Sequence, residues 1–221
     1  MRLISAHRGG DIVDGERAGD RYRRAIALGV DYVEFDVRRS TDGVCVICHD
    51  PDLTQQLHSE AMTLDELLEV TAGRVGLHLD LKEAGYEALV VDTVLEACPV
   101  EKLVITGADS VVRAVKERFP QVRAGLSLGE ELTGAAPWVK ARVRLGELFP
   151  RRRVAWSHAD FVAVHRRLAQ LNVLRYCESA GLPAWVWTVD EEPEIARFLA
   201  DSRVTTLITD RPEVALRLRK G

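Results

Sequence analysis

Apolar and polar residues alternate in several short runs of this chain, and longer stretches of helical periodicity separate the runs. In an extended strand successive side chains face opposite sides, so a strictly alternating run has one apolar face and one polar face. Residues 32–38 show this pattern clearly: Glu34 and Asp36 share one face, and the opposite face is formed by Val33, Phe35 and Val37. The run is short and rich in β-branched residues, which favours a strand over a helix.

The same reasoning predicts alternating strands and helices along the whole chain. We expect strands over 3–6, 32–38, 75–82, 102–106, 122–126, 160–164, 184–187 and 205–208, with a further short extended run over 44–48. We expect helices over 17–28, 63–70, 86–97, 110–119, 138–148, 168–180, 192–200 and 212–218. Thr63 and Glu66 have the spacing of a capping box at the start of the second of these helices.

About eight strand–helix units in 221 residues favour one fold class, the TIM-type (β/α)8 barrel, over an open doubly wound sheet. We expect residues 1–221 to form this barrel as a single domain. Polar residues gather at the predicted carboxyl ends of the strands, where barrel enzymes build their sites. They include His7, Arg8, Glu34, Asp36, Asp80, Lys82, Thr106, Ser127, His165 and Trp187.

Composition narrows the range of partners and locations. The net charge of −4 gives no electrostatic reason to expect a nucleic-acid partner. No run approaches 18 apolar residues, and the first eight residues leave no room for the apolar segment of a secretion signal. We therefore expect a cytoplasmic protein with no stable membrane insertion. Cys45 and Cys48 face opposite sides of one extended run, so we expect the cysteines to be reduced and mostly buried.

The acidic strand is the candidate centre of chemistry. Glu34 and Asp36 are about 6 to 7 Å apart at Cα on one strand face, close enough to bind one hard cation such as Mg²⁺ or Ca²⁺. A turn at 41–43 and the following extended run return His49 towards them. Asp80 adds a third acid on a similar strand face. The alternative interpretation is a solvent-facing strand with ordinary exposed acids.

Several motifs, in order along most of the chain, resemble the glycerophosphodiester phosphodiesterase family. They are Ala6-His7-Arg8-Gly9, Glu16, Glu34-Phe-Asp36, Thr41-Asp-Gly, His49-Asp50-Pro, Leu79-Asp80-Leu81-Lys82, Val186-Trp187-Thr188 and Thr209-Asp210-Arg211-Pro212. The resemblance implies a barrel of the triosephosphate isomerase type that cleaves phosphodiesters with one divalent cation. It further implies that Glu34, Asp36 and Asp80 are the metal ligands and that His7 and His49 are the acid and base. By the same resemblance the substrate-binding residues would be Arg8, Glu16, Lys82 and Trp187.

The chain departs from the family pattern at three places. Arg17 and Ala18 follow Glu16, where the family has Asn and Thr. Asp80 stands where the family usually has Glu, which shortens the reach by one methylene. Only residues 51–62 occupy the position of the family's much longer lid insertion, so we expect a minimal lid and a more open site.

The resemblance implies hydrolysis of a small-molecule glycerophosphodiester to glycerol 3-phosphate and an alcohol. The attacking hydroxyl could come from water or from the substrate itself, in which case a cyclic phosphate forms first. Two other functions are considered. One is a phospholipase-like cleavage of a lysolipid or sphingolipid head group, and the other is a catalytically silent barrel that binds a phosphorylated metabolite.

Overall fold

Eight parallel strands form a closed ring in the computed structural model of the protein, which describes residues 1–50, 61–129, 132, 134 and 136–220. Around the ring the strands are β1 (Leu3–Ala6), β2 (Tyr32–Arg39), β4 (Gly76–Leu81), β5 (Leu103–Gly107), β6 (Arg123–Leu128), β7 (Phe161–His165), β8 (Ala184–Trp187) and β9 (Val204–Thr209). Pairing of β1 with both β2 and β9 closes the barrel. The short β3 (Cys45–Ile47) runs antiparallel beside β2.

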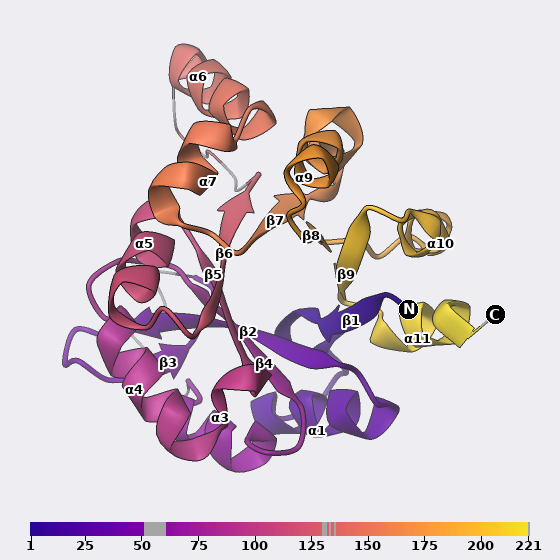
Figure 1. Cartoon of the computed structure of the whole chain (residues 1–221). Coiled ribbons are helices and arrows are strands. Elements are labelled where there is room, and N and C mark those ends of the chain that lie inside the picture. Colours follow the sequence, from indigo (N-terminus) through magenta and orange to yellow (C-terminus); the bar gives the residue numbers. More distant parts are fainter. Residues whose placement is uncertain (51–60, 130–131, 133, 135, 221) are drawn as a thin grey trace.

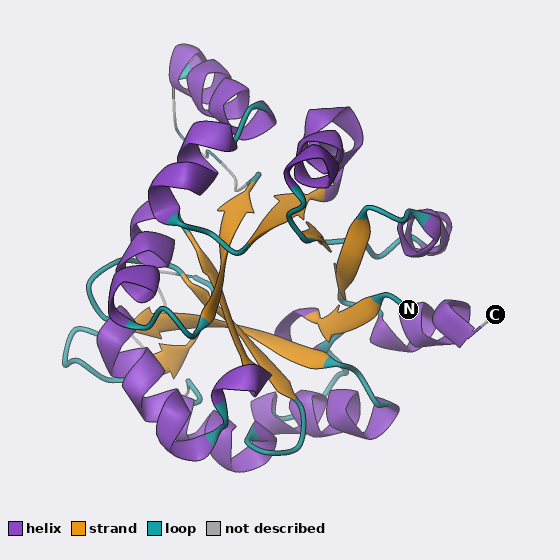
Figure 2. Cartoon of the chain, viewed as in Figure 1, coloured by secondary structure: helices purple, strands orange, loops and turns teal. Residues whose placement is uncertain are grey.

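Helices surround the barrel on its outer side (Figures 1 and 2). They are α1 (Ala18–Leu28), α3 (Leu64–Thr71), α4 (Glu87–Ala97), α5 (Asp109–Arg118), α6 (Pro137–Leu148), α7 (Arg151–Ser157), α8 (Arg166–Leu168), α9 (Leu174–Ala180), α10 (Glu192–Ala200) and α11 (Pro212–Lys220). A single π-helical segment, η3 (Ala169–Val173), joins α8 to α9, and short 3-10 turns occupy η1 (His7–Gly9) and η2 (Val100–Lys102). The predicted TIM-type (β/α)8 barrel is confirmed.

Two apolar cores follow from the alternation along the strands. Val33, Phe35 and Val37 point outwards into the layer between strands and helices. A second, smaller cluster fills the inside of the barrel, where Trp185 packs with its ring centroid 4.7 Å from that of Phe161 and 5.3 Å from that of Tyr32. These aromatic side chains form an apolar layer inside the barrel. The polar inward-facing residues of β2 and β4 lie above this layer, towards the carboxyl ends of the strands.

Some predicted elements differ in extent from the observed ones. The sequence predicts no separate helix at 151–157, where α7 lies, and the helix predicted over 168–180 begins at Arg166. Residues 51–60 of the expected minimal lid lie outside the described residues. The four cysteines are free and buried, as expected. Among the described residues, no helix is long and apolar enough to cross a bilayer.

Candidate active site

A cavity of about 940 Å³ opens at the carboxyl ends of the strands. Most of the candidate residues line it, and they come from strands that are far apart in the sequence. The lining is formed by His7, Arg8, Glu34, Asp36, Arg38, His49, Asp50, His78, Asp80, Lys82, Thr106, Ser127, Ala163, Trp187, Thr188 and Ile208. The predicted clustering of polar residues at one end of the barrel is thus what the fold produces.

Three buried carboxylates meet in this cavity. Glu34 and Asp36 come from β2, and Asp80 comes from the neighbouring β4, where it is paired in register with Asp36. Their exposed fractions are 4%, 2% and 8%, and each offers one oxygen within 4.8 Å of the others. Oxygen ligands at this spacing suit a hard divalent cation.

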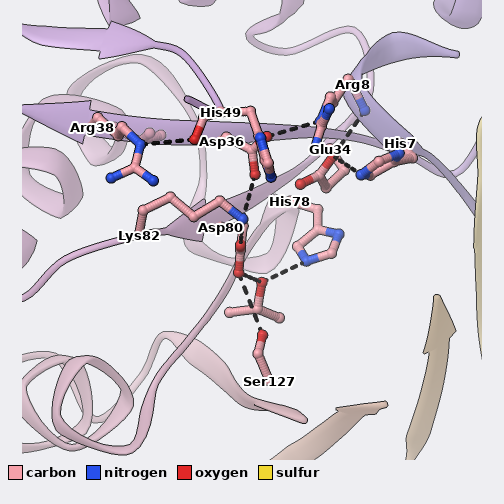
Figure 3. A network of polar contacts seen from close by, with 12 residues as sticks. His7, Arg8, Glu34, Asp36, Arg38, His49, His78, Asp80, Lys82 and Ser127 are labelled. Carbon is pink, nitrogen blue, oxygen red and sulfur yellow. Dashed lines mark hydrogen bonds and ion pairs between the residues drawn. The ribbon is translucent and has the colours of Figure 1, made fainter. Parts of the chain in front are cut away.

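Two cationic side chains lie against the same acids (Figure 3). Arg8 Nε is 2.9 Å from Asp36 Oδ2, and Lys82 Nζ is 2.7 Å from Asp36 Oδ1 and also forms an ion pair with Asp80. Burial lowers the pKa of Lys82, but the two carboxylates raise it more, so its ammonium stays charged. Three carboxylates against two cations leave one excess negative charge within this group.

The excess negative charge fits a bound cation. Burial and repulsion from Asp36 raise the pKa of Glu34 to about 7, so in the absence of a metal this carboxyl partly retains its proton near neutrality. A divalent ion would lower the pKa of Glu34 again, because its charge stabilises the ionised carboxylate. The donor chemistry, burial and spacing of Glu34, Asp36 and Asp80 therefore fit one divalent metal.

Hydroxyl groups from the next two strands orient the carboxylate of Asp80. Thr106 Oγ1 on β5 donates to Asp80 Oδ1 at 2.6 Å, and Ser127 Oγ on β6 lies 3.4 Å from the same oxygen. Burial raises the pKa of Asp80, but Lys82 and the Thr106 hydroxyl lower it more, to about 2. His78 of β4 contacts Ser5 and Thr106 at 3.2 and 3.0 Å and is 2% exposed, so it is a buried histidine with both ring nitrogens in hydrogen bonds.

His7 is oriented by an acid from the other end of the chain. Its Nδ1 lies 2.7 Å from Asp210 Oδ1, while its Nε2 is 4.0 Å from Glu34 Oε2. Because a carboxylate only accepts, Nδ1 carries the proton and Nε2 is left for the cavity. Burial lowers the pKa of His7, but Glu34 and Asp210 raise it more, so the net shift is upwards.

The backbone at Arg8 has an unusual conformation that serves the site. Arg8 has φ 49°, a left-handed value that is uncommon for a residue with a side chain, and Gly9 and Gly10 follow with φ 80° and 98°. This turn lets the Arg8 N–H donate to Glu34 Oε2 at 2.8 Å while the guanidinium reaches Asp36. A strained residue held between two acids is typical of functional sites.

His49 lines the cavity from the loop after β3. Its side chain is exposed, and its carbonyl accepts a hydrogen bond from Arg38 Nε at 3.0 Å (Figure 3). Partial burial and the charge of Arg8 lower the pKa of His49, opposite to the shift of His7. The two imidazoles therefore differ in proton affinity.

The two remaining predicted substrate-binding residues, Trp187 and Glu16, lie in different places. Trp187 of β8 lines the cavity, together with Ala163 of β7 and Ile208 of β9. Glu16 does not line the cavity and is instead bound by Arg24, whose Nε and Nη2 donate to it at 3.1 and 3.0 Å. The structure thus brings together every predicted site residue except Glu16.

Asp210 is the functional residue that sequence reasoning did not single out. It appeared in the Thr209-Asp210-Arg211-Pro212 motif with no role, and only the pairing of β1 with β9 brings it to His7. The position of Asp210 is fixed in turn by Asp190, whose Oδ1 accepts from the Asp210 N–H at 2.8 Å. An acid directly after the last strand was the available signal.

Comparison with known proteins agrees with this geometry. Residues 7–122 match the Glycerophosphoryl diester phosphodiesterase family. A glycerophosphodiester phosphodiesterase from Caldanaerobacter subterraneus is 25% identical over 99% of this chain and 98% of its own length. A probable glycerophosphodiester phosphodiesterase from Mycobacterium tuberculosis is 30% identical over 87% of this chain and 81% of its own length.

Solved structures show the same fold. A glycerophosphodiester phosphodiesterase from Parabacteroides distasonis superposes with a TM-score of 0.79 at 18% identity, covering 99% of this chain and 97% of that one. A phosphodiesterase from Oleispira antarctica, solved in complex with the product sn-glycerol-3-phosphate, superposes with a TM-score of 0.76 at 18% identity, covering 100% and 98%. The chain therefore belongs to the glycerophosphoryl diester phosphodiesterase family, and it is an enzyme of the phosphodiesterase class.

Proposed function

We propose that the chain hydrolyses glycerophosphodiesters to glycerol 3-phosphate and an alcohol with one divalent cation, Mg²⁺ or Ca²⁺. The observation that carries this proposal is the meeting of three buried carboxylates, Glu34, Asp36 and Asp80, in a cavity that also holds His7 and His49. The product-bound phosphodiesterase of Oleispira antarctica, which has the same fold, supports glycerol 3-phosphate as the product.

A phosphodiester is an anion, so its cleavage requires positive charge near the non-bridging oxygens and a proton for the departing alkoxide. When bound at the three carboxylates, the cation supplies charge where it develops in the transition state. Arg8 and Lys82 lie beside the same carboxylates and add to this charge. The arginine fork matches two phosphate oxygens, whereas the ammonium of Lys82 acts as a point charge.

His7 and His49 divide the proton transfers in this proposal. Asp210 holds the proton on Nδ1 of His7, so Nε2 accepts a proton when neutral and donates one when charged. His49, from the loop after β3, takes the complementary role. Trp187, Ala163 and Ile208 form an apolar wall that suits the glycerol or alcohol carbons.

The deciding experiment measures release of glycerol 3-phosphate from glycerophosphocholine with Mg²⁺, with Ca²⁺ and with chelator. We expect turnover with a cation, none with chelator, and a loss of about 100-fold or more for His49→Ala, the usual weight of a general acid or base. Phosphorus NMR of the same reaction detects a cyclic phosphate if the substrate hydroxyl attacks first. Cation binding by calorimetry without turnover of any diester would instead support the silent barrel.

A cytoplasmic location and the absence of a nucleic-acid partner are also part of this proposal. The acidic net charge gives no electrostatic reason to expect a nucleic-acid partner.

A further inference from the structure

Helix α6 is more exposed than the other helices' packing on the barrel would suggest: half of its residues are exposed and five are partly buried. Among its described residues only Glu147 is buried. Large apolar side chains are exposed on it and directly after it: Trp138 is 70% exposed, Leu145 60% and Phe149 63%. In Figure 1, α6 lies farther from the strands than α7, the helix that follows it. An apolar surface of this kind on a folded protein marks an interaction site.

The exposed apolar residues form one stripe. Trp138 and Leu145 are seven residues apart and Phe149 follows four later, so helical periodicity puts them on one face, together with Arg142. Leu171 of η3, 59% exposed, lies nearby, because the next residue, Asn172, donates to the carbonyl of Leu148 at 2.9 Å. We call Trp138, Leu145, Phe149 and Leu171 the apolar stripe.

The stripe lies at the same end of the barrel as the cavity. Glu147, in the last turn of α6, accepts a hydrogen bond at 2.9 Å from the N–H of Gly129, which directly follows β6. The carboxyl end of β6 is also where Ser127 lines the cavity. The last turn of α6 therefore lies beside the carboxyl end of β6, the end of the barrel at which the cavity opens.

Basic residues are frequent in and directly after α6, even though the whole chain is acidic. Between residues 137 and 153 the basic residues are Lys140, Arg142, Arg144, Arg151, Arg152 and Arg153, and the single acid is Glu147. Two of these basic residues are paired with acids: Arg144 Nη1 is 2.6 Å from the buried Glu147, and Arg153 forms an ion pair with Asp109 of α5. The exposed basic side chains of this segment are therefore Lys140, Arg142, Arg151 and Arg152. Tryptophan, leucine and phenylalanine beside arginines and lysines is the composition of helices that lie in a membrane interface.

We propose that α6 and the apolar stripe dock the enzyme on an anionic phospholipid surface. Trp138, Leu145 and Phe149 enter the head-group region, and the neighbouring basic side chains contact lipid phosphates. A second copy of the chain fits this surface less well, because a symmetric contact would bring the same positive charges together. Docking needs no catalysis, so the proposal does not rest on the proposed function and is tested without turnover.

The test is co-sedimentation with vesicles of phosphatidylcholine alone or with 30 mol% phosphatidylglycerol, in chelator. We expect binding to the anionic vesicles to be about ten-fold or more tighter, and to weaken as salt screens the basic residues. Trp138→Ser/Leu145→Ser/Phe149→Ser should reduce binding by about ten-fold or more, since it removes the buried apolar area. Lys140→Gln/Arg142→Gln/Arg152→Gln should reduce binding only to the anionic vesicles.

A matched pair of single variants separates the stripe from general surface hydrophobicity. Leu145→Ser should weaken vesicle binding, whereas Leu28→Ser, which changes an exposed leucine at the end of α1, should not. Circular dichroism and thermal unfolding, unchanged in both, confirm that the barrel is intact. Equal binding by Leu145→Ser, Leu28→Ser and wild type would overturn the proposal. So would a wild-type dimer in light scattering that the triple stripe variant converts to monomer without any vesicle binding.

Discussion

Asp80 depends on its neighbours more than the other two candidate ligands do. Thr106 Oγ1 donates to it at 2.6 Å and also contacts His78, so this hydroxyl fixes the rotation of the carboxylate. Because Asp80 is one methylene shorter than the glutamate usual in the family, a small rotation would carry its oxygen out of reach of a shared ion.

Thr106→Val removes this hydroxyl with little change in volume. We expect it to weaken cation binding about 10- to 100-fold, the usual effect of losing a group that orients a metal ligand. Isothermal calorimetry with Mg²⁺ and Ca²⁺ measures it. Ser127→Ala, which removes the longer 3.4 Å contact, is the matched control and should have a smaller effect. Equal affinities in the two variants would contradict the orienting role of Thr106.

The role of His7 as acid or base is testable through Asp210. Asp210→Asn removes a charge that raises the pKa of His7, so that pKa should fall. The limb of the kcat/KM profile that reports His7 then moves to lower pH. A shift of the alkaline limb identifies His7 as the acid, and a shift of the acidic limb identifies it as the base. Glu213→Gln removes an exposed charge nearby and is the control: it should leave the pH dependence of kcat/KM unchanged.

The local sequence pattern was enough to predict the acids of the site, but not the residues that contact and orient the site residues. A period of two put Glu34 and Asp36 on one strand face, and the same rule applied to Asp80. The contact between His7 and Asp210 spans 203 positions in the sequence and depends on barrel closure through β1 and β9. No local pattern predicts which acid from a distant strand completes such a pair.

At the scale of elements, α3 has the most clearly specified beginning. The Thr63 side chain accepts from the Glu66 N–H, and the Glu66 carboxylate accepts from the Thr63 N–H, so the predicted capping box is present. Thr63→Ala should lower the free energy of unfolding by about 1 kcal/mol, because it leaves a helix N–H without its partner. Thr93→Ala, within α4, is the control and should change it little, since Thr93 binds back to the Leu89 carbonyl. Urea unfolding of both variants measures the difference.

Helix α7 illustrates why some elements escape prediction. Its sequence begins with three arginines after Pro150, a pattern that fits the end of a loop as well as the start of a helix. Tertiary contacts determine it instead: Arg153 Nε is 2.9 Å from Asp109 Oδ1, and the guanidinium of Arg113 stacks 4.6 Å from the Trp156 ring. Helical stability that comes from packing on α5 cannot be read from seven residues alone.

At the scale of the whole molecule, the aromatic cluster inside the barrel packs together side chains from several strands of the ring. A Cβ at Gly125 of β6 would overlap the ring of Phe161, which packs on Trp185. Gly125→Ala should therefore lower the free energy of unfolding by about 1 to 3 kcal/mol, the range for overpacking a dense core. Gly146→Ala, at a helical position with open space for a Cβ, should not destabilise the chain. Thermal unfolding of the two variants measures this difference. Equal stability of Gly125→Ala and Gly146→Ala would mean that the core around Gly125 tolerates an added methyl group.

The metal site should also link the stability of the whole barrel to pH. Without a cation, burial and Asp36 raise the pKa of Glu34 from its ordinary 4.5 to about 7. Between these values the folded state binds more protons than the unfolded state, so the chelated protein should lose stability as pH rises from about 4.5 to 7. A cation favours the ionised carboxylate and adds about 2.7 kcal/mol at one hundred times its Kd. The rise in Tm on adding Ca²⁺ should therefore be larger at pH 8 than at pH 5, and Glu34→Gln should reduce both the rise and its pH dependence. Calorimetry showing the same rise at both pH values would mean that Glu34 does not hold the ion.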